Sequence, residues 1–365
     1  MKIIIDFGHP AHVHYFKNFV KIMKENGHKF SFIARDKEIA HQLLNHYQIP
    51  YKSRGKGAKS LLGKLLYIFY ADYIIFRKAL TFKPDLFLSF ASTYAAHASW
   101  LVKKPHIALD DTEHAKFELM MYPPFSDVIL NPSCFSKRFS EKQIFFNSYM
   151  ELCYMHPNYF KPDPEIVKGY GVNPDEKYFV LRFVSWKASH DIGQAGLDLE
   201  YKKKIIEKLS PQGKILISSE GTLPQQFEKY RISINPVDLH HFLYFADLYI
   251  GEGSTTASEC AVIGTPAIYI NSLTVGYCKE QDEVYNACYH FKKPHGVLKK
   301  IDELLISDTL KIDHRKKAQQ IINDKIDPTA FLVWFVENYP QSKKIMKENP
   351  SYQYKFRSND GISPL

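Results

Sequence analysis

The segment from residue 246 to residue 270, ADLYIGEGSTTASECAVIGTPAIYI, restricts most strongly what this chain can fold into. Two short apolar runs, residues 248–250 and 267–270, are separated by a stretch of the length of one helix. This order predicts a parallel strand–helix–strand unit. Glycines directly after the first run permit a tight turn into the helix. The segment therefore places at least this part of the chain in the α/β class.

The turn inside this unit has the composition of an anion site. Gly253 lets the backbone approach a ligand closely, and Ser254, Thr255 and Thr256 offer hydroxyl and free N–H groups where the helix begins. Glu259 lies one helical turn after Thr255, opposite a face of small residues that would pack on the sheet. Its carboxylate could accept two hydrogen bonds from a ribose diol. The alternative is an ordinary α/β unit with a favourable helix start.

The alternation of strands and helices occurs twice along the 365 residues, which predicts two domains. Residues 157–174 are rich in proline and glycine and are predicted to be a linker. A second alternating set begins near residue 178. We expect an N-terminal Rossmann-like domain over residues 1–160, a C-terminal one over 175–325, and a late helix with a loose tail over 326–365.

Charge and cysteine usage restrict the partners and the compartment. The net charge of +9 favours anionic partners such as nucleotides or phospholipid headgroups. The basic residues are dispersed and no recognition motif is present, so nucleic acid is not an expected partner. The five cysteines form no C-x-x-C pair, and neither a signal peptide nor an apolar run of about 20 residues is present. These observations favour a cytoplasmic protein.

Residues 61–80 form an aromatic-rich segment, LLGKLLYIFYADYIIFRKAL, with Lys64, Arg77 and Lys78 along it. We predict a core helix here. A helix that lies on an anionic membrane surface is the alternative.

Three histidines follow the first predicted strand, residues 2–7, and make its end a candidate site. A zinc site would need further ligands at suitable spacing beside His9, His12 and His14, and none is apparent, so no metal is expected. His12 stands at the start of a helix beyond the carboxyl end of a strand, where open α/β sheets bind ligands, and could act as a general base. Gly8 and His14 are candidates for substrate binding in the same turn. A neutral, helix-capping histidine is the alternative.

A cluster of acids, Asp110, Asp111 and Glu113, follows another predicted strand at residues 106–109. Carboxylates this close together need basic partners or raised pKa values, which is typical of acid/base sites. Asp111 and Glu113 are the predicted catalytic members. Equally, the three could cap and begin the following helix.

In the second half, Arg182 ends an otherwise apolar strand and is predicted to bind a diphosphate with its guanidinium group. Ser219 and Glu220 follow the next predicted strand and would reach the same site. Ordinary loop polarity is the alternative for both.

The strand, Gly/Ser/Thr turn, helix with Glu259, and G-x-P that follows resemble the C-terminal nucleotide site of GT-B glycosyltransferases. The pattern is most similar to the N-acetylglucosaminyltransferase of peptidoglycan synthesis and to UDP-N-acetylglucosamine 2-epimerases. The segments HPAHVHYF, DDTEHA and LRFVSWKASH are similar to a bacterial and archaeal family, domain of unknown function 354. The resemblance implies two Rossmann-like parallel-sheet domains facing a cleft, with the C-terminal helix returning to the N-terminal domain. The turn would hold the diphosphate, and Glu259 the ribose.

This resemblance implies a glycosyltransferase that moves a sugar from a nucleotide-diphosphate donor, UDP-linked, to an envelope glycan or lipid-linked acceptor. His12 stands where the transferase has its histidine, although His9 and Pro10 replace that enzyme's glycines. The base would be His12 or an acid of residues 110–113. No metal or other cofactor is needed, because helix N-termini and Arg182 would meet the diphosphate charge. The alternatives are a nucleotide-sugar 2-epimerase or hydrolase, favoured if the acids are catalytic, and a non-catalytic glycan-binding protein. Peripheral contact with the inner face of the cytoplasmic membrane is left open.

Overall fold

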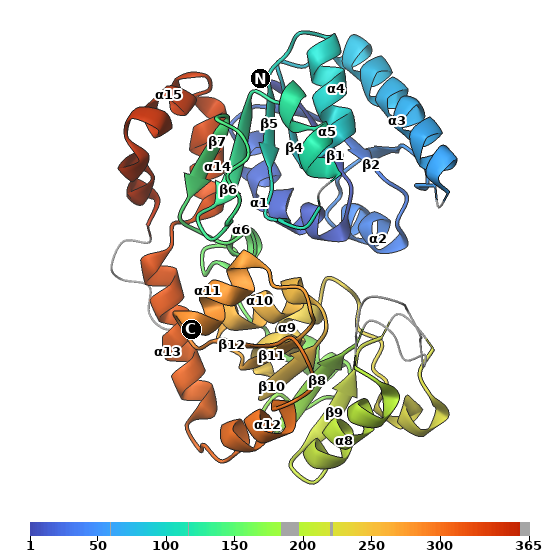
Figure 1. Cartoon of the computed structure of the whole chain (residues 1–365), viewed down its shortest axis with the longest axis vertical. Coiled ribbons are helices and arrows are strands. Elements are labelled where there is room, and N and C mark those ends of the chain that lie inside the picture. Colours follow the sequence, from blue (N-terminus) through green and yellow to red (C-terminus); the bar gives the residue numbers. More distant parts are fainter. Residues whose placement is uncertain (59, 116, 184–196, 220–221, 358–365) are drawn as a thin grey trace. The chain divides into compact units, whose positions relative to one another are not determined.

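The chain forms two compact units in the computed structural model, which describes residues 1–58, 60–115, 117–183, 197–219 and 222–357 (Figure 1). The first unit contains Met1–Tyr154 and Lys325–Arg357, and the second begins at Met155 and runs to Asp324. The chain therefore enters the second unit before the proline- and glycine-rich segment, and its last helices belong to the first unit.

The first unit is built on a seven-stranded sheet in the order β3-β2-β1-β4-β5-β6-β7, with all neighbours parallel. Its inner strands are continuous apolar runs because helices cover both faces of a parallel sheet. The bounds are β1 Lys2–Phe7, β2 Lys29–Ala34, β3 Tyr51–Ser53, β4 Leu86–Phe90, β5 His106–Leu109, β6 Val128–Pro132 and β7 Gln143–Phe146.

The helices of this unit begin at recognisable capping residues. Pro10 stands at the first position of α1, and the His9 side chain accepts a hydrogen bond from the N–H of Ala11. Ser60 caps the N–H of Gly63 in α3 in the same manner. The bounds are α1 Pro10–Glu25, α2 Glu38–His46, α3 Leu61–Phe82, α4 Thr93–Leu101, α5 Glu118–Met121, α6 Leu152–Met155, α14 Pro328–Glu337 and α15 Gln341–Glu348, with 3-10 turns at Pro123–Phe125 and Pro350–Phe356.

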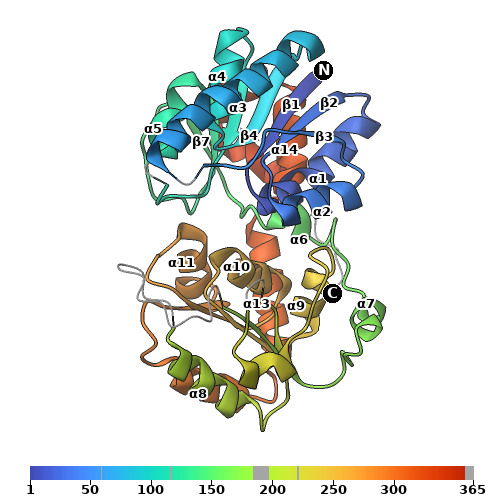
Figure 2. The same cartoon turned by 90° about the vertical axis from the view of Figure 1, so that its right-hand side faces the viewer.

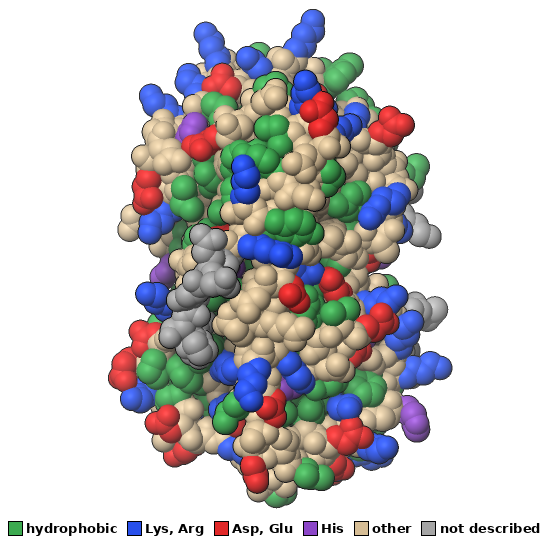
Figure 3. All heavy atoms as spheres, turned by 90° about the vertical axis from the view of Figure 1, so that its left-hand side faces the viewer, with side chains coloured by type: hydrophobic (Ala, Val, Ile, Leu, Met, Phe, Trp, Pro, Cys, Tyr) green, Lys and Arg blue, Asp and Glu red, His purple; other side chains and the backbone are tan. Residues whose placement is uncertain are grey.

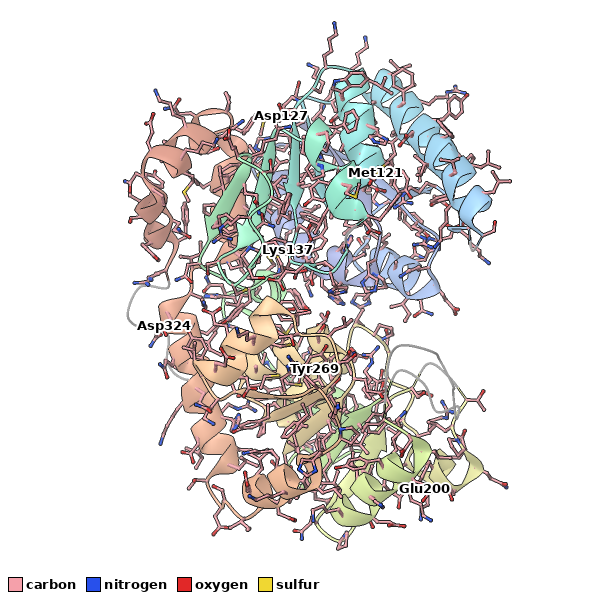
Figure 4. All side chains as sticks on the ribbon, in the orientation of Figure 1. Met121, Asp127, Lys137, Glu200, Tyr269 and Asp324 are labelled. Atoms are coloured by element: carbon pink, nitrogen blue, oxygen red, sulfur yellow. The ribbon has the colours of Figure 1, made fainter. Side chains whose placement is uncertain are left out.

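The second unit has a five-stranded parallel sheet in the order β12-β11-β10-β8-β9. One continuous apolar cluster lies between this sheet and α8 and α12. Tyr269 of β11, labelled in Figure 4, is buried in this unit. The bounds are β8 Tyr178–Arg182, β9 Lys214–Ile217, β10 Leu248–Gly251, β11 Ala267–Ile270, β12 Cys288–Phe291, α7 Pro164–Gly169, α8 Leu199–Leu209, α9 Leu239–Phe245, α10 Ser254–Ile263, α11 Gly276–Glu283, α12 Val297–Leu305 and α13 Leu310–Asp324, with a 3-10 turn at Gln225–Tyr230.

The C-terminal segment corrects one prediction, because the tail expected to be loose within residues 326–365 has regular structure from Gln341 to Phe356. It forms α15 and a 3-10 turn that packs on α14. Tyr352 stacks on Trp334 with ring centroids 4.7 Å apart, and Phe356 lies 5.4 Å from the same ring. The Gln353 side chain accepts a hydrogen bond from the N–H of Asn147 at 2.6 Å. The polar composition was misleading because a few aromatic contacts anchor an otherwise solvated segment.

Helix α3 also differs from the prediction of a core helix. It buries one narrow stripe, Ala71, Ile75 and Ala79, whereas large apolar side chains on the remaining surface are 50–68% exposed. These are Leu62, Leu65, Leu66, Phe69, Tyr70, Tyr73 and Leu80. In Figure 2 the helix runs across the face of the unit turned toward the viewer.

On the face shown in Figure 3, by contrast, acidic and basic side chains are interspersed. Within the described residues, no helix is both long and apolar enough to span a membrane.

Candidate functional site

Each sheet reverses its strand order at one point, and both points carry predicted site residues. The reversal lies between β1 and β4 in the first sheet and between β8 and β10 in the second. In open parallel sheets the loops on either side of such a point diverge, and ligands bind beyond the carboxyl ends of the strands there. Each unit thus contains a candidate site of its own.

In the second unit, the reversal brings Arg182 beside the glycine turn after β10. Arg182 ends β8, and its Cα pairs with that of Gly251 across the ladder. Its carbonyl oxygen accepts a hydrogen bond from the N–H of Glu252 at 3.2 Å. A Cβ on Gly251 would overlap the Tyr249 hydroxyl and the Arg182 carbonyl, so glycine is required at this position. The Arg182 side chain is half-buried at the edge of the turn.

The turn itself presents an open helix N-terminus. Gly253 directly precedes α10, and no side chain of the described residues caps this helix. A Cβ on Gly253 would meet no atom of the described residues within 4 Å, so these residues leave the backbone there open to a ligand. Ser254 and Thr255 are half-buried, whereas Thr256 is buried, and the Ser254 hydroxyl accepts a hydrogen bond from Tyr277 at 2.8 Å. Uncapped N–H groups at a helix start are a general anion site.

Glu259 is buried in α10, and its partner was not predicted from the sequence. The residue is 5% exposed, and its Oε1 lies 3.0 Å from Nε2 of His240 in α9. Both side chains are buried, so the carboxylate is held in one orientation. A second buried carboxylate, Glu252, accepts the N–H of Leu197 at 2.7 Å and lies 3.7 Å from the Lys202 ammonium group.

Of the other residues predicted for this unit, Ser219 follows β9 and is half-buried. Its carbonyl oxygen is 3.4 Å from Nη1 of Arg231. Glu220 lies outside the described residues, as do residues 184–190 of the LRFVSWKASH segment.

In the first unit, His12 lies at the reversal with its ring 4.6 Å from that of Phe90 at the end of β4. The N–H of Gly8 donates to its Nδ1 at 3.3 Å, which assigns the proton of the neutral ring to Nε2. Burial, and then the positive charges of His9, Lys37 and Arg54, hold the pKa of His12 well below 6.5. In this tautomer His12 offers an N–H donor, whereas the predicted base would need a free Nε2 lone pair.

His14 has different surroundings from His12. It is buried, and its ring stacks on that of Tyr154 at 5.1 Å. These contacts give it a packing role in the first unit.

The acids after β5 separate into two anchored groups and one less constrained group. Asp110 accepts hydrogen bonds from the N–H of Thr112 at 2.8 Å and from the Tyr122 hydroxyl at 2.7 Å. Glu113 accepts the N–H of Ser136 at 2.5 Å. Asp111 accepts only the Thr112 hydroxyl, at 3.1 Å, among the contacts seen in the described residues. Burial and then the Asp110 charge raise the pKa of Asp111 to about 7, close to a working pH.

A buried ion pair that was not predicted lies between β1 and the end of β3. Arg54 Nε donates to Asp6 Oδ1 at 2.8 Å, and the Ser92 hydroxyl donates to Oδ2 at 2.5 Å. Arg54 Nη1 donates to the Tyr67 hydroxyl at 2.6 Å. The sequence contained one signal, because an aspartate inside the apolar strand KIIIDF needs a buried cation. Across the described residues, no group of three His, Cys, Asp or Glu side chains is placed to hold a metal ion.

The two all-parallel sheets define the chain as a GT-B protein, an architecture shared with solved enzymes of known class. The chain is 12% identical to UDP-GlcNAc 2-epimerase from Neisseria meningitidis, solved with UDP-GlcNAc bound, over 96% of this chain and 100% of that one, with a TM-score of 0.66. It is 16% identical to MurG of Acinetobacter baumannii, over 92% and 99% of the two chains, with a TM-score of 0.57.

The chain belongs to the family described as Protein of unknown function (DUF354), whose model matches residues 1–340. A relative in Methanocaldococcus jannaschii, itself an uncharacterized protein, is 27% identical over 283 residues, which cover 73% of this chain and 81% of that one. The solved neighbours are thus similar in fold, whereas the relative by sequence carries no assigned activity.

Proposed function

We propose that the protein is a glycosyltransferase that moves a sugar from a UDP-linked donor to an envelope glycan or lipid-linked acceptor. The observation that carries the proposal is the β10–α10 turn, where open backbone at Gly253, the uncapped start of α10 and Arg182 meet at the reversal of the second sheet. These groups offer N–H donors and a positive charge to one anion. A nucleotide diphosphate fits this chemistry.

The donor contacts in this proposal are divided along the turn. The N–H groups at the start of α10, with the hydroxyls of Ser254 and Thr255, hold the diphosphate, and Arg182 neutralises its charge. Glu259 accepts hydrogen bonds from the ribose hydroxyls, and His240 fixes its orientation. Positive charge and N–H donors that are already positioned against the diphosphate stabilise the negative charge that develops on it in the transition state, so this step does not require a metal.

For the acceptor we propose Asp111 as the base, with His12 as a hydrogen-bond donor. Asp111 removes the proton from the acceptor hydroxyl while the oxygen of that hydroxyl bonds to the anomeric carbon of the donor sugar. The bond from that carbon to the diphosphate oxygen breaks, and the nucleotide diphosphate leaves with the electron pair. The raised pKa of Asp111 supports the assignment, since a base works best when its pKa is near the operating pH.

The first test is a calorimetric titration of the purified chain with UDP, GDP, dTDP and CMP and their sugars. We expect UDP to bind and Gly253→Ala to weaken it by about tenfold or more, because a methyl group would obstruct the approach of the diphosphate. Gly169→Ala is the matched control, since a Cβ there also meets no described residue within 4 Å, but this glycine lies in α7. If no nucleotide binds, or if Gly253→Ala binds UDP as the wild type does, the donor site is wrong.

A nucleotide-sugar 2-epimerase is the second candidate, favoured by the buried acids at the end of β5. Proton NMR of UDP-N-acetylglucosamine with the protein and no acceptor separates the two. We expect an inert donor. Isomerised sugar or free UDP, formed at enzymatic rates and lost in Asp111→Asn, would favour the epimerase or hydrolase instead.

We propose further that the outer face of α3 rests on an anionic membrane surface, where a lipid-linked acceptor would be found. Seven large apolar side chains on this helix are at least half exposed, and Lys64, Arg77 and Lys78 are interspersed with them. Apolar side chains that can enter the interface, combined with basic ones that meet lipid phosphates, are typical of interfacial helices.

A further inference from the structure

A second anion-binding arrangement lies in the first unit, around the Arg54 guanidinium. Arg54 follows β3 directly, is 3% exposed, and has its charge balanced by Asp6. Two of its three nitrogens are occupied, Nε by Asp6 and Nη1 by the Tyr67 hydroxyl. The Tyr94 ring lies under the guanidinium carbon at 4.5 Å. These contacts hold the group in one orientation before any ligand arrives.

The third nitrogen, Nη2, borders a small space above Gly8. A Cβ on Gly8 would lie 3.6 Å from Nη2 and 3.6 Å from Cε1 of His12, so both groups line the position that glycine leaves empty. Within the described part of the chain, no group accepts a hydrogen bond from Nη2. The space lies beyond the carboxyl end of β1, at the reversal of the sheet, where ligands bind in this fold class.

His12 borders the same space with Cε1, and the ring nitrogen that can donate, Nε2, is bonded to that carbon. Its Nδ1 already accepts the Gly8 N–H, so the neutral ring carries its proton on Nε2. Further positive charge stands close by, since Lys37 and Arg35 both act on the neighbouring His9. Arg35 follows β2, and its buried Nε has no hydrogen-bond partner among the described residues. A fixed Nη2 donor with no acceptor among the described residues, near the further positive charges of Arg35 and Lys37, favours an anion.

We propose that Arg54 Nη2 and His12 Nε2, above Gly8, form a second anion site that binds a phosphoryl group of the acceptor. A phosphoryl group is favoured over a carboxylate because it presents several oxygens to donors in different directions and carries more charge. The assignment of this phosphoryl group to the acceptor rests on the proposed function. The proposal that an anion binds here does not depend on that function. Gly8 is then required because any side chain would occupy the ligand's place.

The test is calorimetric titration of the full chain with pyrophosphate, and separately with acetate. Three matched variants are compared with the wild type: Gly8→Ala in this site, Gly253→Ala in the donor turn, and Gly169→Ala as the control. The added methyl at position 8 meets Arg54 and His12 at ordinary contact distance, so the variant should fold. We expect two classes of pyrophosphate site in the wild type, and loss of one class in Gly8→Ala and of the other in Gly253→Ala.

Arg54→Lys provides an independent variant. A lysine keeps a cation beside Asp6, whereas Arg54→Ala would leave that carboxylate buried and unpaired and could unfold the chain. We expect Arg54→Lys to weaken the Gly8-dependent class by about tenfold or more, because it removes the fixed Nη2 donor. UDP affinity should be unchanged.

The outcomes separate this proposal from the donor assignment. Pyrophosphate binding that survives in both Gly8→Ala and Arg54→Lys would overturn the second anion site and leave the donor site untouched. Acetate that binds as well as pyrophosphate in a Gly8-dependent manner would overturn the assignment to a phosphoryl group. Loss of UDP binding in Gly253→Ala alone concerns the proposed function and not this site.

Discussion

At the scale of single residues, the candidate sites depend on charged groups that are buried and oriented by neighbours distant in sequence. Asp6 and Arg54 are 48 residues apart, and His240 and Glu259 are 19 apart. A sequence pattern shows that a charge stands in an apolar element, but it does not show which residue folds against it. For this reason Asp111 and Glu259 are candidates from the sequence, whereas their buried neighbours, and the partners Arg54 and His240, are visible only in the structure.

Asp111 gives a prediction about pH. In the proposed mechanism deprotonated Asp111 is the active base, so transfer should rise with pH through a midpoint of about 7 and flatten above it. Asp111→Asn should slow transfer by about 10²–10⁴-fold and remove this midpoint. A pH–rate profile of the wild type and the variant checks both. An unchanged profile in Asp111→Asn would assign the base to another group.

The same residue makes a prediction about stability. Its pKa in the folded chain lies above the ordinary value of 3.8, so the fold disfavours the charged form. The contribution of Asp111 to stability should therefore fall as pH rises from about 4 to about 7. Asp111→Asn should lessen this fall, which urea unfolding across that pH range would measure. A steeper fall in the variant would contradict burial as the main cause of the shift.

Glu259 gives a prediction about donor binding. Glu259→Gln keeps the shape of the side chain and a hydrogen-bonding group for His240 but removes the charge that we propose to hold the ribose. We expect UDP affinity to fall by about one to two powers of ten, with the melting temperature little changed. Calorimetric titration and thermal unfolding of the same preparation check this. Full affinity in a folded variant would make the Glu259–His240 pair purely structural.

At the scale of elements, the central strands were predictable, whereas three of the four edge strands were not. Residues 2–7, 106–109 and 267–270 were predicted as strands with their observed bounds, because each is a continuous apolar run. The strands that were missed, β3, β7 and β12, all lie at the edge of a sheet. These three strands are covered on fewer sides, and their sequences alternate or are polar, whereas the fourth edge strand, β9, has an apolar run and was predicted.

Helix α3 gives a prediction about membranes. A double variant, Leu66→Glu with Phe69→Glu, should abolish sedimentation with vesicles rich in phosphatidylglycerol, because it places charge in the apolar face. The control is Ile306→Glu with Ile312→Glu, which changes two exposed apolar residues of the second unit. Binding should weaken with salt and be poor on phosphatidylcholine alone. If the wild-type protein does not sediment with vesicles but forms a dimer that the α3 variant disrupts, this face is instead a contact between two copies of the chain.

At the scale of the whole molecule, the doubled α/β pattern predicted two parallel sheets and the GT-B class, and both are confirmed. The pattern succeeds because alternation of buried strands with helices restricts the topology of a sheet. The chemistry is less restricted by the same pattern, since one architecture serves glycosyltransferases and epimerases. The identities of the donor and the acceptor, and the side chain that acts as base, are therefore proposals that rest on particular residues.

Because the first unit contains both the beginning and the last helices of the described chain, the two units can complete their folds in a different order from the order of their synthesis. Within the described residues the second unit is one continuous stretch, whereas the first requires α14, whose Thr329 hydroxyl donates to the carbonyl of Cys153 at 2.9 Å. On the ribosome, residues 1–154 emerge first but lack the helix that packs on α1. The unit that is made second can therefore complete its fold first, and the N-terminal sheet must wait for the last helices before its core is closed.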